Sequence, residues 1–98
     1  MASETRLVSK TGSQVKEPKR YKVVMYNDDF TPMDFVVEIL KTIFNKEHQE
    51  AVDIMMQVHR GGRAVVGIYS YDIAMTKTQE AMHLARQSGY PFQVKVEA

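Results

Sequence analysis

The spacing of apolar residues changes repeatedly along this chain, and it constrains the fold more than any other feature. Residues 21–26 are a short aromatic and β-branched run, which is typical of a strand. From Met33 the apolar residues recur at steps of three and four, as in an amphipathic helix; they are Met33, Val36, Val37, Leu40, Ile43 and Phe44. We expect Asn45 to end this helix and to cap the next.

The second helix carries Val52, Met55, Val58 and His59 on one face, and Gly61-Gly62 should end it. Residues 63–69 form a second strand. Ser70 or Asp72 then caps a third helix that runs to Ser88. Finally, Phe92, Val94 and Val96 alternate with polar residues, which indicates a strand with one buried face.

The order β-α-α-β-α-β predicts an α+β fold, in which a three-stranded, mostly antiparallel sheet has three helices packed on one face. Residues 1–20 lack apolar periodicity, so we expect a disordered N-terminal extension before a core domain of residues 21–98. A core of roughly 80 residues buries little surface, and any binding site should therefore be a surface cleft.

Composition narrows the possible partners. The extension carries five Lys or Arg against two Glu, whereas the core carries eight against ten and has no basic stripe interleaved with aromatics. We therefore expect no nucleic acid partner. Cysteine is absent, which excludes thiolate metal sites. The sequence has no run of about 20 apolar residues, so we expect no membrane-spanning helix. The expectation is a monomer in the cytoplasm.

The segment that joins the first strand to the first helix, Asn-Asp-Asp-Phe-Thr-Pro-Met-Asp over residues 27–34, is the richest in chemistry. Thr31 as N-cap, Pro32 at the first helical position and Asp34 in the first turn would start the helix. Asn27, Asp28 and Asp29 are then left over. Two carboxylates and an amide at a strand exit are suited to holding a cation.

The helix face of His59 makes this residue the candidate to join them. It lies one turn after Met55, on the side that must face the core or border a cleft. One alternative is a partly buried histidine bonded to a backbone carbonyl. The other is a histidine that reaches the strand end carrying Asn27 and Asp29.

A divalent metal is the first candidate cation. Asp28, Asp29 and His59 form an oxygen-rich set that would suit a metal-dependent hydrolase. However, their spacing matches no standard ligand pattern, and His48 and His83 fall on solvated helix faces. The chain also has no cysteine, no Gly-x-Ser-x-Gly elbow and no phosphate-binding glycine loop.

The α-ammonium group of another polypeptide is the second candidate, and it fits better. It presents three N–H donors, to which Asn27, Asp29 and His59 offer three acceptors. The first side chain would then lie beside Met33, Val36, Met55 and Val58, and methionine adapts to several bulky shapes. A third possibility is an interaction domain without specificity for a terminal amine.

These residues resemble the ClpS adaptors of the bacterial N-degron pathway. The resemblance covers residues 20–98, and its specific part is the Asn-Asp-Asp-aromatic-Thr-Pro-Met block followed at the right distance by Val58-His59. It implies an adaptor rather than an enzyme, in the bacterial cytoplasm, with no catalytic residue, metal or cofactor. Such an adaptor binds substrates that begin with Leu, Phe, Tyr or Trp. It delivers them to the ClpAP protease through the N-terminal domain of the AAA+ unfoldase ClpA.

The resemblance also assigns roles to residues. Asn27, Asp29 and His59 would bind the substrate's amine, and Asp28 and Thr31 its backbone. The hydrophobic pocket would comprise Met33, Val36, Met55, Val58 and Phe92, with Met33 excluding β-branched first residues; Asp72, Thr76 and Lys77 would dock on the unfoldase. The family usually has Leu at the position of Phe92, Glu at that of Met75 and Glu at that of Asp72. The extension would act during delivery.

Overall fold

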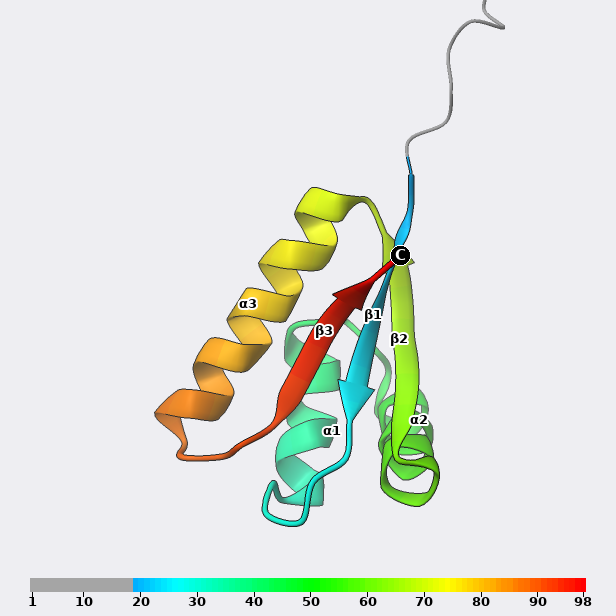
Figure 1. The fold of residues 1–98 in the computed structure, drawn as a ribbon. Coiled ribbons are helices and arrows are strands. Elements are labelled where there is room, and N and C mark those ends of the chain that lie inside the picture. The colour runs from blue at the N-terminus through cyan, green and yellow to red at the C-terminus, as the bar shows by residue number, and fades with distance from the viewer. Residues whose placement is uncertain (1–18) are drawn as a thin grey trace, which may run out of the picture.

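Three strands form one antiparallel sheet with the first strand in its centre (Figure 1). The structure is a computed structural model that describes residues 19–98. Strand β1 (Tyr21–Tyr26) pairs on one side with β2 (Arg63–Tyr69) and on the other with β3 (Gln93–Glu97). Except for its last two residues, the predicted extension lies outside the described residues.

Three helices cover one face of this sheet (Figure 1). They are α1 (Met33–Thr42), α2 (His48–Gly61) and α3 (Tyr71–Gln87), so the predicted element order and α+β fold are confirmed. The predicted start of α2 is wrong. The N-cap of α2 is Glu47, not Asn45, because Asn45 takes a left-handed conformation with φ of 57° that belongs to the turn after α1. None of the helices in residues 19–98 has both the length and the apolar character needed to cross a membrane.

The core lies between the sheet and the helices because strand residues alternate between the two faces. Val23 and Met25 point to the helices and are fully buried. Helix α3 meets them with small side chains, the buried Ala74, Ala81 and Ala85, which let its backbone lie close to the sheet.

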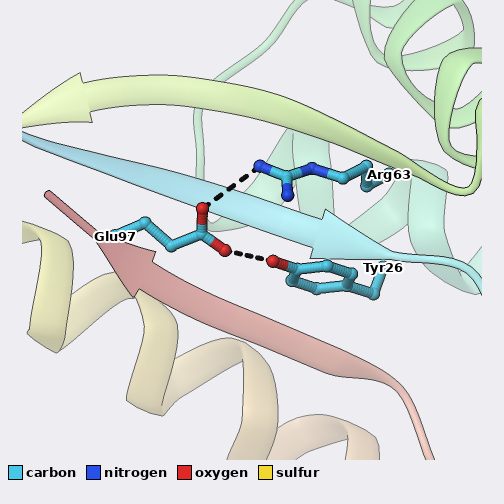
Figure 2. A network of polar contacts seen from close by, with 3 residues as sticks. All are labelled: Tyr26, Arg63 and Glu97. Atoms are coloured by element: carbon cyan, nitrogen blue, oxygen red, sulfur yellow. Dashed lines mark hydrogen bonds and ion pairs between the residues drawn. The ribbon is translucent and has the colours of Figure 1, made fainter.

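The other face of the sheet has no helix over it, yet Val24 in its centre has no exposed surface. Figure 2 shows a polar network in which the Tyr26 hydroxyl donates to the Glu97 carboxylate, and Arg63 donates to its second oxygen over 3.1 Å. Val24 lies between these positions in the strand register, so the network covers it. The bond from Tyr26 is the main reason that the pKa of Glu97 is lowered.

Candidate functional site

A cleft of about 390 Å³ opens where β1 leaves the sheet. The backbone explains its position, because the N–H of Asn27 donates to the carbonyl of Gly62 over 2.9 Å. Gly62 ends α2 with φ of 89°, a conformation that glycine adopts without strain. The end of α2 is therefore held beside the end of β1. The lining residues are Asn27, Asp28, Asp29, Phe30, Thr31, Pro32, Met33, Val36, Met55, Val58 and His59.

Asp28 organises the loop that forms one side of the cleft. Its Oδ1 accepts hydrogen bonds from the N–H groups of Phe30 (2.8 Å) and Thr31 (2.7 Å), and its Oδ2 accepts one from the Thr31 hydroxyl (2.7 Å). Desolvation of Asp28 acts to raise its pKa, but the three hydrogen bonds outweigh this, so the pKa lies below its usual range. The charged carboxylate is thus used mainly to fix the loop.

This network corrects the predicted start of α1. The N-cap is Pro32, which is extended with φ of −65° and ψ of 145°, and the helix begins at Met33. No side-chain hydrogen bond caps the helix, so Thr31 is not its N-cap. The Thr31 hydroxyl instead donates to the charged carboxylate of Asp28, a stronger partner than a neutral group. Asp34 does lie in the first turn, as predicted.

The three residues predicted to bind an amine meet in this cleft. Asn27 and Asp29 come from the loop and His59 from α2, and all three are exposed. Among the hydrogen bonds found within residues 19–98, none uses their side chains. They offer an amide oxygen, a carboxylate and an imidazole nitrogen to a ligand. The alternative of a partly buried His59 bonded to a backbone carbonyl is wrong, because the side chain is exposed.

The same cleft has an apolar wall. Val36 of α1 and Met55 and Val58 of α2 line it and are otherwise buried in the core. Met33, at the first position of α1, is 43% exposed and therefore stands at the mouth rather than in the wall. A polar end and an apolar wall in one cleft suit a ligand with a charged group next to a bulky apolar one.

A metal ion suits the site less well. Within the part of the chain that the structure describes, no group of three or more His, Asp or Glu side chains is arranged to hold one. Asp28, a ligand in the hydrolase hypothesis, already accepts three hydrogen bonds. The geometry therefore favours a cation that brings its own N–H donors.

Comparison with known proteins identifies the family. The family described as "ATP-dependent Clp protease adaptor protein ClpS" matches residues 16–95. The chain belongs to the ClpS family. It is 46% identical over 93 residues to the ClpS adapter of Nautilia profundicola, covering 95% of this chain and 96% of that protein. It is 53% identical over 81 residues to that of Treponema denticola, covering 83% and 80%.

A solved structure agrees. Agrobacterium tumefaciens ClpS2 bound to L-phenylalaninamide superimposes with a TM-score of 0.81 and 42% sequence identity, covering 83% of this chain and 98% of that one. The family consists of adaptor proteins of the Clp protease, so this chain is an adaptor of that class.

Phe92 departs from the pocket expected of a ClpS protein. It is 1% exposed and does not line the cleft. Its ring packs edge-on against Phe35 with centroids 6.3 Å apart, and Phe35 in turn packs against Tyr90. Phe35, a residue of α1 that does not line the cleft, thus holds Phe92 in the core. Phe92 therefore does not line the cleft, contrary to the prediction.

The three residues predicted to dock on the unfoldase lie on α3. Asp72 and Thr76 are exposed and one helical turn apart. Lys77 is partly buried, and its Nζ donates to the carbonyl of Ile43 over 2.8 Å, just beyond the end of α1. Lys77 therefore also joins α3 to α1, a structural role that the sequence did not indicate.

One cleft residue has no role predicted from the sequence. Phe30 lines the cleft and is 77% exposed, but its place in the loop motif did not indicate a contact with a ligand. The signal for it is a large aromatic residue among acids and turn-forming residues, where no apolar stripe explains it. Side chains of this kind on surface loops often serve in binding.

Proposed function

We propose that this protein binds polypeptides that begin with Leu, Phe, Tyr or Trp, through their free α-amino group and first side chain. It would deliver them to the ClpAP protease by docking on the N-terminal domain of ClpA. The observation that carries this proposal is the meeting of Asn27, Asp29 and His59 with an apolar wall in one cleft. The first residue of a polypeptide has this combination of charge and apolar bulk.

The chemistry of the amine supports the polar end of the proposal. An α-ammonium has three N–H donors, and the three exposed acceptors offer one partner for each. Asp29 adds a negative charge, which makes its bond stronger than a neutral one. The ligand of the Agrobacterium relative, L-phenylalaninamide, has a free α-amine and a phenyl side chain without a carboxylate, as a first residue in a peptide does.

The chain behind the first residue would be held by Thr31 and Asp28. The hydrogen of the Thr31 hydroxyl is donated to Asp28, which leaves the hydroxyl oxygen free to accept a peptide N–H. Asp28 accepts three bonds and has capacity for one more. Met33 would contact the first side chain at the mouth and exclude branching at Cβ.

Delivery would use α3. Asp72 and Thr76 are exposed on one face of this helix and are free to contact a partner. Lys77 would contribute its exposed part, while its amine keeps the bond to Ile43. We assign these three residues to the contact with the unfoldase.

Titration of a peptide that begins with Phe against its N-acetylated twin tests the binding step. Acetylation removes the charge and at least two donors, and loss of one charge-assisted bond costs about 1.5–3 kcal/mol, or roughly ten- to a hundredfold in affinity. Equal affinity for both peptides would refute the proposal and leave an interaction domain without amine specificity.

A pair of variants adds a matched control. Asp29→Asn should lose most of the discrimination between the free and acetylated peptides. Asp34→Asn removes the same charge from an exposed position in the first turn of α1, outside the cleft, and should keep it. Equal effects of the two changes would point to general electrostatics rather than a specific contact.

A further inference from the structure

Phe30 has the largest exposed fraction, 77%, of the large apolar side chains in residues 19–98. Exposure of a phenylalanine forgoes about 1.5–3 kcal/mol of burial free energy. Its backbone is nevertheless held in place, because the N–H of Phe30 donates to Asp28 over 2.8 Å. Its side chain lines the same cleft as Asp29. An exposed apolar side chain that extends from a fixed backbone into the lining of a cleft is suited to a ligand contact.

Backbone dimensions decide which part of a ligand it reaches. Successive Cα atoms lie about 3.8 Å apart, so the Cα of Phe30, from which the ring extends, lies this distance from the Cα of Asp29. If Asp29 holds the amine, the second residue of the ligand has its Cα about 3.8 Å from the first, and the third lies up to about 7 Å away. If the first side chain lies against the apolar wall, the side chain of the second residue is the nearest one that can meet the ring of Phe30.

We propose that Phe30 forms a second subsite, which takes an apolar side chain at the second position of the bound polypeptide. This inference rests on the proposed function, since the position of the ligand follows from its amine. It adds a preference that neither the amine-binding residues nor the wall formed by Val36, Met55 and Val58 supplies. Leu, Met or an aromatic residue would pack on the ring, whereas Ser or Gly would leave it exposed.

A double-mutant cycle measures this contact. Two peptides that begin with Phe-Leu and Phe-Ser, and are otherwise identical, are titrated against the full-length protein, Phe30→Ala and Phe30→Leu. Contacts between aromatic and apolar side chains correspond to roughly a two- to tenfold change in affinity. The protein should prefer Phe-Leu by this factor. Phe30→Ala should abolish the preference, and Phe30→Leu should keep part of it.

Ile68→Ala serves as the control, because Ile68 is 52% exposed on β2 and does not line the cleft. It should leave both affinities unchanged. Thermal unfolding of each variant checks that the fold is intact, and the bonds to Asp28 are kept in Phe30→Ala because they use backbone N–H groups.

The results separate this inference from the proposed function. Equal affinity of the protein for Phe-Leu and Phe-Ser, or a preference that survives in Phe30→Ala, would overturn the second subsite. If acetylation still abolished binding, the proposed function would stand without it. If acetylation had no effect, the proposed function would fail and the second subsite with it.

Discussion

The loop that carries the amine site depends on one carboxylate, and replacing it gives a quantitative test. Asp28→Ala removes the acceptor for two backbone N–H groups and the Thr31 hydroxyl, at distances of 2.7–2.8 Å. Asp28 is an acceptor in the loop before α1 rather than its N-cap, and loss of a hydrogen bond within a folded chain typically costs about 0.5–1.5 kcal/mol. Because a third, charge-assisted bond is lost too, we expect the free energy of unfolding to fall by about 1–2 kcal/mol.

Asp34→Ala isolates the contribution of charge. Asp34 is exposed in the first turn of α1, and its carboxylate makes no hydrogen bond with residues 19–98. Its removal therefore tests only the interaction of an acid with the helix N-terminus, about 0.3–1 kcal/mol. Urea unfolding at pH 7 should show a larger loss for Asp28→Ala than for Asp34→Ala.

The effect of Asp28 should also depend on pH, in a known direction. Its pKa is lower in the folded chain than in the unfolded one, where it is about 3.9. The contribution of its charge is therefore complete above pH 3.9 and is lost as the pH falls through the lower folded value. The difference between Asp28→Ala and the unchanged protein should shrink below about pH 4. A difference that is absent at pH 7, or constant down to pH 3, would refute the reasoning.

Three further predictions concern the ligand and α3. Met33→Ala should bind peptides that begin with Val or Ile about tenfold more tightly than the unchanged protein, because it opens the mouth of the cleft; unchanged selectivity in titration would exclude the gating role. His59→Ala should bind a peptide that begins with Phe more weakly than the unchanged protein, because one of the three acceptors for its amine is lost; equal affinity in titration would show that His59 is not an acceptor. Lys77→Met should lower stability to urea by about 1 kcal/mol through its lost bond to Ile43, whereas Thr76→Ala should not; equal midpoints would show that this bond adds nothing.

Much of the site could be predicted from local sequence because its parts are local. The acidic loop follows a strand directly, and the stripe that places Met55, Val58 and His59 on one face is a property of helix geometry. The structure brings these parts together as expected. Phe92 shows the limit of this reasoning. Alternation predicts that it is buried, but its neighbours decide whether it lines the cleft, and Phe35 holds its ring in the core.

The second limit of prediction from sequence is the choice among several hydrogen-bond partners that one group can have. Thr31 followed by Pro32 favours an N-cap at Thr31, yet the N-cap is Pro32, no side chain caps α1, and the Thr31 hydroxyl donates to Asp28. Lys77 looks like an exposed docking residue, yet its amine donates to the carbonyl of Ile43, just beyond the end of α1. Neither choice is visible without the distances between the groups.

The sequence by itself determined the order of strands and helices, the apolar faces and the chemical content of the loop, because each follows from the spacing of residues along the chain. The tertiary structure decided which of these groups share a cleft. The bond from Asn27 to Gly62 sets the end of α2 against the end of β1, and so brings His59 to Asp29. The bond between Asn27 and Gly62 depends on how β1 and α2, which are distant in the sequence, pack together. The apolar periodicity within either segment does not determine this packing.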